Sequence, residues 1–126
     1  MEDVEFSAEF CRFIQTTIPD VDAAELLLLF HARQGEALTA EEAATNLGSR
    51  ARPADLRAYL DSFTSYGLLS GVERRYQYRP ESPLAHLVES LAQAYSQRPV
   101  TLVRIIYALR DSQVRSFADA FRLRRK

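Results

Sequence analysis

Residues 39–79, TAEEAATNLGSRARPADLRAYLDSFTSYGLLSGVERRYQYR, contain the pattern that decides the fold. Thr39 stands three residues before Glu42, which is the spacing of a capping box at the start of a helix. The sequence therefore predicts a helix over residues 40–47. Gly48 follows it, and glycine readily adopts the positive φ that ends many helices.

A second helix is predicted from Pro53 to about Tyr66. Proline suits the first position of a helix because the N–H that it lacks would have no partner there. Apolar side chains recur along this segment at the helical period, which predicts one buried face. That face consists of Leu56, Tyr59, Leu60 and Phe63. Gly67 is expected to end the helix.

Two short strands are predicted next, over residues 68–72 and 76–79, with a turn at 73–75 between them. Tyr76 and Tyr78 alternate with polar residues, as in a half-buried strand. The order of helix, turn, helix and two-stranded ribbon is typical of a winged helix.

Helices are also predicted on both sides of this motif. Phenylalanines and isoleucines recur at helical spacing over residues 4–18, which predicts an amphipathic helix. Asp22 and Glu25 have capping-box spacing and predict a helix that runs to Gln34 before Gly35. After the ribbon, the pair Ser82–Pro83 predicts the start of a helix that ends near residue 97.

The predicted fold class is mainly α: a winged helix-turn-helix with a short two-stranded β wing and additional N- and C-terminal helices. The 126 residues, 47% apolar and 26% charged, are enough for one domain with its own core. We expect a single domain over residues 1–126, with an N-terminal helix in 1–20, the winged-helix core in 21–80 and C-terminal helices in 81–126.

Cysteine content and hydropathy indicate the compartment. Cys11 is the single cysteine, which excludes an internal disulfide and agrees with a reducing environment. No apolar run approaches the roughly 20 residues of a membrane span. The acidic start of the chain also lacks the basic region of a signal peptide. A cytoplasmic protein without a membrane partner is therefore expected.

Charge is distributed unevenly along the chain, although the formal net charge is −1. Residues 1–38 carry eight acids and two arginines, whereas residues 98–126 carry eight bases and two acids. The two ends can attract one another within one chain or between two copies, or they can be two solvated faces.

Residues 99–109 are apolar on nearly every side. Their β-branched residues are compatible with a strand, but the length of the segment and the proline at its start favour a helix. A segment of this kind is either buried or part of a subunit interface. The residues predicted to form a dimer interface are Val103, Ile105, Ile106 and Tyr107. The apolar stripe of Val114, Phe117 and Phe121 and the basic residues of 122–126 suit a further helix, and the basic end can also bind an acidic partner.

The string from Thr39 to Pro80 resembles the winged helix-turn-helix of bacterial transcription regulators, broadly the MarR-like kind, with YGLL at residues 66–69 where the recognition helix leads into the wing. The closing string RSFADAFRLRRK, residues 115–126, is similar to small bacterial winged-helix proteins of unassigned role. In the regulators the second helix enters the DNA major groove, the wing touches phosphates or the minor groove, and outer helices form a dimer.

The resemblance implies a DNA-binding transcription regulator that acts as a homodimer. Winged helices also bind proteins, so a winged-helix protein–protein interaction module without direct DNA binding is the alternative. The outward side chains expected on the second helix favour this alternative, since they are small or acidic: Ala54, Ala58, Asp61 and Ser65.

Six arginines are the candidate DNA contacts. Arg57, on the flank of the second helix, is the one residue there that can make the bidentate contact to guanine. Phosphate contacts are predicted for Arg50, Arg52, Arg74, Arg75 and Arg79. Each arginine can instead pair with an acid such as Glu41, Asp55 or Glu73. Residues 39–79 contain six arginines and five acids, a thin charge footprint for a nucleic-acid-binding domain.

No enzymatic activity, metal site or cofactor is expected. The sequence has no glycine-rich phosphate loop, nucleophile elbow or His-Glu-x-x-His motif. His31 and His86 have no carboxylate partner at ligand spacing and are expected at the edges of the core. One cysteine and two histidines are too few soft ligands for a metal site. A small-ligand site between the outer helices and the winged helix is compatible with the sequence, but no residue indicates the chemistry of its ligand.

Overall fold

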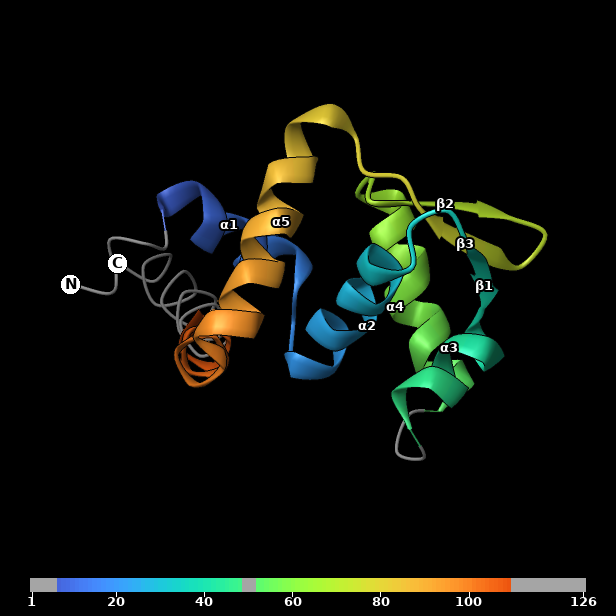
Figure 1. Cartoon of the computed structure of the whole chain (residues 1–126), viewed down its shortest axis with the longest axis horizontal. Helices are drawn as coiled ribbons and strands as arrows, with labels where there is room; N and C mark the ends of the chain where they lie inside the picture. The colour runs from blue at the N-terminus through green and yellow to red at the C-terminus, as the bar shows by residue number, and fades with distance from the viewer. Residues whose placement is uncertain (1–6, 49–51, 110–126) are drawn as a thin grey trace, which may run out of the picture.

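The computed structural model describes residues 7–48 and 52–109, and it is mainly helical with a small antiparallel sheet of three strands (Figure 1). This confirms the predicted mainly α class. The elements are α1 (Ala8–Thr17), α2 (Val21–Ala32), β1 (Ala37–Thr39), α3 (Ala40–Leu47), α4 (Pro53–Ser65), β2 (Leu69–Val72), β3 (Arg75–Tyr78) and α5 (Ser82–Gln97). A helical segment over residues 99–109 follows α5.

Local capping interactions position α3. The Oγ1 of Thr39 accepts from the backbone N–H of Glu42 at 3.1 Å, and Oε1 of Glu42 accepts from the N–H of Thr39 at 2.9 Å. The predicted capping box is therefore confirmed. The bond from the Thr39 N–H also holds the pKa of the Glu42 carboxyl below its ordinary value, helped by nearby Arg75. Gly48, with φ of 105°, ends the helix as expected.

The second predicted helix is also confirmed, as α4. Leu56, Leu60 and Phe63 are buried, and Tyr59 is half-buried against the same core. After Ser65 the chain turns at Gly67. Its φ is 84°, a value that residues with a Cβ rarely adopt. The turn leads directly into β2.

The sheet has one strand more than the sequence predicted. β1 pairs with β3, so the strand order is β1-β3-β2 and the ribbon is not two-stranded. β1 has only three residues, too few to show the alternation of apolar and polar residues by which a strand is recognised in a sequence. Their strand conformation depends on pairing with residues almost 40 positions away, such as Leu38 with Tyr76. The hairpin turn is Glu73–Arg74, and both residues have positive φ, which matches the twist of a two-residue hairpin.

The two N-terminal helices begin at other residues than the sequence predicted. Ser7 caps α1, which starts at Ala8, and residues 4–6 lie outside the described part of the chain. Asp20, not Asp22, caps α2, because its Oδ1 accepts from the N–H of Ala23 at 2.9 Å. In the described ranges, no helix is long and apolar enough to cross a bilayer.

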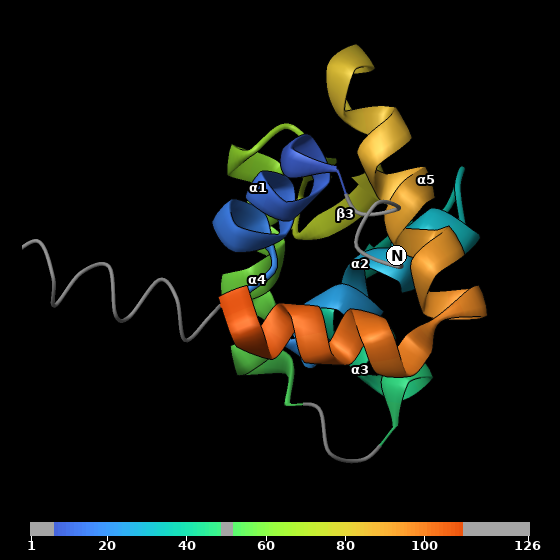
Figure 2. The same ribbon diagram turned by 90° about the vertical axis from the view of Figure 1, so that its left-hand side faces the viewer.

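α2 lies in the middle of the molecule, with α1 and α5 on one side and α3, α4 and the sheet on the other (Figure 1). Seen from the side, the segment 99–109 lies crosswise to α5 and below α1 (Figure 2). One cluster of buried residues joins all these parts. Its largest fully buried side chains include Ile14, Leu26, Phe30, Leu60, Phe63, Leu91, Leu102 and Ile106. The core therefore holds α4 against α2 and leaves the opposite face of α4 exposed.

Candidate nucleic-acid interface

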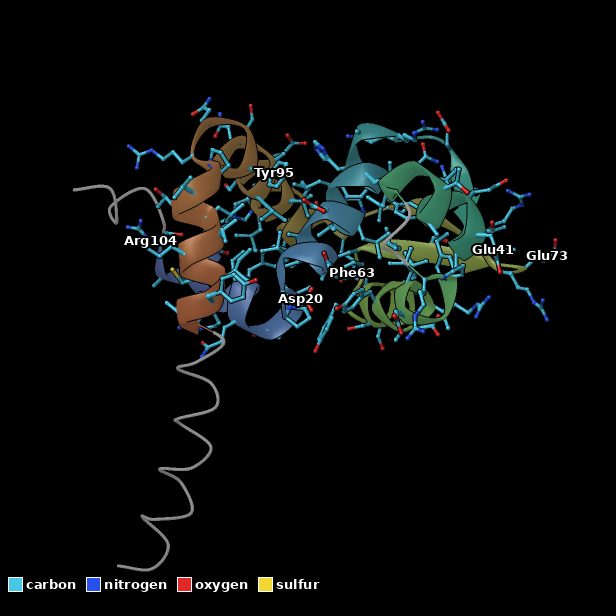
Figure 3. All side chains as sticks on the ribbon, turned by 90° about the horizontal axis from the view of Figure 1, so that it is seen from below. Asp20, Glu41, Phe63, Glu73, Tyr95 and Arg104 are labelled. Carbon is cyan, nitrogen blue, oxygen red and sulfur yellow. The ribbon has the colours of Figure 1, made fainter. Side chains whose placement is uncertain are left out.

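The exposed face of α4 lies next to the start of α3 and beside the β2–β3 hairpin. The side chains that the sequence placed on this face are all exposed: Ala54, Arg57, Ala58, Asp61 and Ser65. Glu41, at the start of α3, and Glu73, at the hairpin turn, lie at the same end of the molecule, far from Arg104 (Figure 3). We call this surface the α4 face.

Arg57 is held by an acid from the neighbouring helix. Its Nη2 donates to Oε2 of Glu41 at 2.8 Å, which joins the second turn of α4 to the first turn of α3. Both side chains are at least half exposed, at 50% and 63%. The pair is therefore worth little stability, on the order of 0–1 kcal/mol. The ion pair fixes the position of the guanidinium. A ligand that takes the place of Glu41 would have to break only this weak pair.

Two of the predicted phosphate contacts are paired in the same way. Arg75 donates through Nη1 to Oε1 of Glu42 and to the carbonyl of Ala37, both at 3.1 Å. Arg52 donates through Nε to Oδ2 of Asp55, three residues on, at 3.3 Å. Pairing with nearby acids was the alternative that the sequence left open. The acid beside Arg75 is Glu42, which the sequence indicated as a capping residue and not as a partner of an arginine.

The remaining predicted contacts are unpaired or lie outside the described residues. Arg74 is exposed at the hairpin turn and Arg79 is exposed just after β3. Among the described residues, neither side chain has a hydrogen bond or ion pair. Arg50 lies in the segment 49–51, outside the described residues. Of the predicted contacts that the structure describes, Arg74 and Arg79 are thus the two without a partner.

Asp61 is tied to the hairpin. The hydroxyl of Tyr76, in β3, donates to Oδ1 of Asp61 at 2.7 Å. Partial burial raises the pKa of Tyr76, and the bond to the carboxylate raises it further. The bond connects α4 with β3 and occupies one oxygen of the Asp61 carboxylate.

A second tyrosine fixes α4 to the start of α2. The hydroxyl of Tyr59 donates to Oδ2 of Asp20 at 2.5 Å, while Oδ1 of the same carboxylate caps α2. Desolvation raises the pKa of Tyr59 well above its usual value, and the hydrogen bond to Asp20 adds to this. Core packing, Asp20 and Tyr76 together set the orientation of α4.

The histidines join α5 to its neighbours. Nε2 of His31 lies 2.9 Å from Glu89 of α5, and Nε2 of His86, on α5, lies 3.3 Å from Glu9 of α1. His31 is at the edge of the core, as expected, but the side chain of His86 is 59% exposed. Sequence spacing missed both carboxylates because they are 58 and 77 positions away. Within the described ranges, no group of three or more His, Cys, Asp or Glu residues is placed to hold a metal ion.

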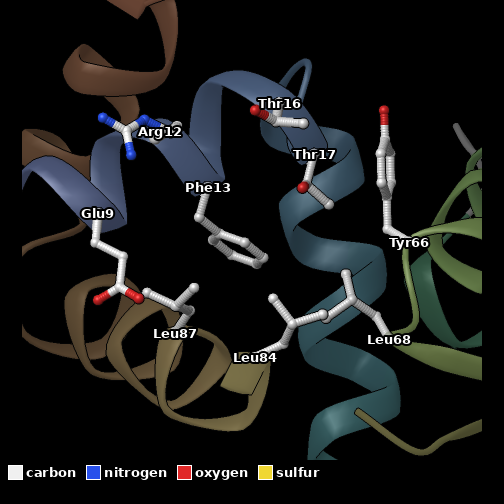
Figure 4. Close-up of a pocket in the computed structure, with 9 residues that line it drawn as sticks. All are labelled: Glu9, Arg12, Phe13, Thr16, Thr17, Tyr66, Leu68, Leu84 and Leu87. Carbon is white, nitrogen blue, oxygen red and sulfur yellow. The ribbon is translucent and has the colours of Figure 1, made fainter. Parts of the chain in front are cut away.

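An apolar cavity of about 260 Å³ lies between α1, α5 and the turn after α4 (Figure 4). Its walls are made mainly by Phe13, Tyr66, Leu68, Leu84 and Leu87. A second hollow, of about 490 Å³, lies between α2 and the start of α4 and is more polar, with Asp22, Glu25, Arg52 and Asp55 in its lining. The first is where the sequence left a small-ligand site open, and its walls identify no ligand chemistry.

The predicted dimer-interface residues divide into two groups. Ile106 is 1% exposed and packs in the core of its own chain, so its side chain is not available to a partner, a correction to that expectation. Val103 and Ile105 are half-buried, and Tyr107 is 50% exposed. Val100, three residues before Val103 on the same side of the helix, is 68% exposed. The stripe of Val114, Phe117 and Phe121 lies outside the described residues.

Comparisons with protein-family models, with curated proteins and with solved structures found no match to this chain. Function is therefore argued from the α4 face and the surfaces around it.

Proposed function

We propose that this chain is a winged-helix protein that binds double-stranded DNA as a transcription regulator, with α4 as the recognition helix and the β2–β3 hairpin as the wing. The order α2-β1-α3-α4-β2-β3, with strand order β1-β3-β2, supports the winged-helix assignment. The observation that carries the DNA-binding proposal is the placement of exposed arginines along α4 and on both sides of it, with Arg74 and Arg79 unpaired at the wing.

The proposed contacts follow from the shape of DNA. An α-helix fits the major groove, where Arg57 can donate two hydrogen bonds to the O6 and N7 atoms of guanine. The wing then lies along the DNA backbone, so Arg74 and Arg79 contact phosphates. Arg52, at the start of α4, and Arg75, beside the start of α3, contact further phosphates.

The ion pairs on the α4 face are compatible with this proposal on energetic grounds. Each pair joins two side chains that are at least 46% exposed, so water screens the attraction and opening the pair costs little. A phosphate contact returns a charge-assisted hydrogen bond and releases a condensed counterion. Exchange of a carboxylate for a phosphate is thus favourable at low salt and weak at high salt.

A homodimer is part of the proposal. Val100, Val103 and Tyr107 fall on one side of the helix 99–109 at spacings of three and four residues and are at least partly exposed. A dimer in which both α4 faces reach one duplex would let two weak half-sites act together.

A titration of a labelled mixed-sequence duplex tests the DNA-binding proposal. Wild-type protein is expected to bind at low salt, and the double variant with Arg57→Ala and Arg74→Ala is expected to lose most of this affinity. Arg12→Ala is the matched control, because Arg12 is an exposed arginine on α1, and α1 lies on the other side of the molecule from α4 (Figure 1). Absence of wild-type binding at low salt, or equal losses in the double variant and in Arg12→Ala, contradicts the proposal.

The protein-binding alternative is favoured by one specific observation. Arg52, Arg57 and Arg75 are each neutralised by an acid, and the centre of the α4 face is made of Ala54 and Ala58. The variant Ala58→Arg separates the two functions, since a new cation in the centre of the face strengthens binding to DNA but obstructs a close-fitting protein partner.

A further inference from the structure

The ion pair between Arg57 and Glu41 differs from the local pair of Arg52 and Asp55 on the α4 face. Arg52 and Asp55 are three residues apart on one helix, with side chains 79% and 62% exposed. Glu41 and Arg57 are 16 residues apart and bridge two helices at 2.8 Å. We propose that Glu41 is a positioning residue that presents Arg57 to guanine, and that it sets base preference at the contacted position. This inference rests on the proposed DNA-binding function.

Both partners are anchored at the backbone. Glu41 lies in the first turn of α3, which the capping box of Thr39 and Glu42 fixes. Arg57 lies next to Leu56 on α4, and Leu56 is buried. Because the two helices pack on one another, the carboxylate of Glu41 occupies a defined place beside the guanidinium. The long side chain of Arg57 is thus held at its tip and at its base.

The pair leaves the guanidinium able to contact a base. The structure gives one hydrogen bond from Arg57 to Glu41, through Nη2, and a guanidinium has five N–H donors. The donors that remain can make the two parallel bonds that guanine accepts. Glu41 therefore need not release Arg57 on binding, and it can orient the arginine while the base is contacted.

A competing acid lies on the same side of α4. Asp61 is four residues after Arg57, which is one helical turn, so its carboxylate is a natural partner for the arginine. In the structure Asp61 accepts from the hydroxyl of Tyr76, and the arginine pairs with Glu41 instead. Burial and the bond to Asp61 raise the pKa of Tyr76, and the nearby charge of Arg57 offsets part of that rise. Tyr76 thus helps to direct Arg57 toward Glu41.

The expected effect is modest because the pair is exposed. A free arginine loses rotamer freedom when it contacts a base, and a pre-positioned one loses less. The energy of an exposed ion pair limits the gain, so we expect Glu41→Gln to weaken the preference for guanine by about two- to fivefold. Loss of a negative charge near DNA should at the same time strengthen binding to all sequences.

Glu73→Gln is the matched control. Glu73 is an exposed acid at the wing turn, and among the described residues it has no side-chain partner. The substitution removes the same charge from the same surface without touching Arg57. It should strengthen binding to all sequences and leave the base preference unchanged. Arg57→Lys keeps the charge but lacks the planar fork, so it should lose the guanine preference while the salt dependence remains.

The test is selection of bound duplexes from a random pool, followed by competition titrations of the selected duplex against single-base variants. The expected result is a guanine whose preference depends on Arg57, is weakened two- to fivefold in Glu41→Gln and is unchanged in Glu73→Gln. Circular dichroism of each variant confirms that it is folded. Equal preferences in Glu41→Gln and wild type, equal losses in the two acid variants, or no Arg57-dependent guanine overturn the inference while DNA binding stands. Absence of wild-type binding to any duplex overturns the proposed function as well.

Discussion

At the scale of single residues, hydrogen bonds from tyrosine hydroxyls to carboxylates connect several elements in the described part of the chain. Tyr59 donates to Asp20, Tyr76 to Asp61 and Tyr95 to Glu25, and each bond joins two elements that are far apart in sequence. A tyrosine is suited to this because its ring packs on apolar neighbours while its hydroxyl reaches a polar partner.

The bond of Tyr59 is expected to contribute to stability. The variant Tyr59→Phe keeps the ring but leaves Oδ2 of Asp20 without its partner, so the free energy of unfolding should fall by about 1 kcal/mol. Tyr95→Phe is the control, because that hydroxyl bonds to Glu25 at the exposed surface and its loss should matter less. Urea denaturation measures both. Equal stabilities of wild type and Tyr59→Phe would show that the bond to Asp20 contributes nothing.

Tyr78 leads to the opposite expectation. Its hydroxyl is buried without a hydrogen-bond partner among the described residues, and burial raises its pKa to about 12. A phenol that ionises later in the folded than in the unfolded chain contributes stability fully below the ordinary value of 10, and this is lost between pH 10 and about 12. Tyr78→Phe should therefore raise stability at neutral pH by about 1 kcal/mol and reduce the loss between about pH 10 and pH 12. Urea denaturation at neutral pH and at alkaline pH measures both effects. A variant that is less stable than wild type under both conditions contradicts this expectation.

Glu42 gives a prediction at acid pH. Its carboxyl has a lowered pKa in the folded chain, so its contribution is present above the unfolded value of 4.5 and is lost as the pH falls below it. Glutamine at the same position keeps the capping-box geometry without a titratable group. Glu42→Gln should lose less stability than wild type between pH 6 and pH 3.5. Parallel curves of stability against pH for the two proteins would contradict the assignment.

At the scale of elements, the sequence predicts best where a structure depends on its own residues. The bounds of α3 and α4 follow from the box at Thr39, from Pro53 and from the glycines after each helix, all of them local signals. β1 escaped prediction because only its pairing with β3 makes it a strand. The start of α2 was misassigned because Asp20 and Asp22 both precede helical residues, and the choice between them depends on backbone conformation.

The candidate site shows the same division. The exposed side of α4 followed from the helical period, so Arg57 and its neighbours could be placed from the sequence. The partners could not, because the pairing of Arg75 with Glu42 and of Tyr76 with Asp61 depends on how the hairpin folds against α3 and α4. Sequence spacing does not carry that information.

The joint between α4 and the wing can be tested with glycines. Gly67 has a φ of 84°, and a Cβ there would lie 2.7 Å from the side chain of Glu81. Gly67→Ala is expected to destabilise the protein by about 1–2 kcal/mol, mainly through the strained backbone. Gly71→Ala is the control, since φ is not positive there and the nearest atom, of Tyr76, is at 3.5 Å. Thermal unfolding compares them, and similar losses for the two variants would contradict the role given to Gly67.

At the scale of the whole molecule, α2 and the core join a candidate dimer surface on one side to the α4 face on the other (Figure 1). The helix 99–109 both contributes Ile106 to the core and exposes Val100 and Tyr107. A helix with apolar residues on two sides is expected to pack on two surfaces, one in its own chain and one in a partner.

The dimer prediction can be tested with one charge. Tyr107→Asp places a carboxylate on the exposed side of the helix and should convert a dimer to a monomer at tens of micromolar in sedimentation velocity. Val72→Asp is the control, because Val72 is an exposed apolar residue of the wing, 65% accessible, away from this surface. A wild-type monomer at this concentration, or an unchanged dimer in Tyr107→Asp, contradicts the proposed interface.

The central claim is that the α4 face binds duplex DNA through arginines, and the salt dependence of binding tests it most directly. The logarithm of the association constant, measured between 50 and 200 mM salt, should fall linearly with the logarithm of salt concentration. Arg74→Ala should reduce the slope by about one for each bound chain. No binding at the lowest salt, or a slope that is the same for wild type and Arg74→Ala, would contradict the account.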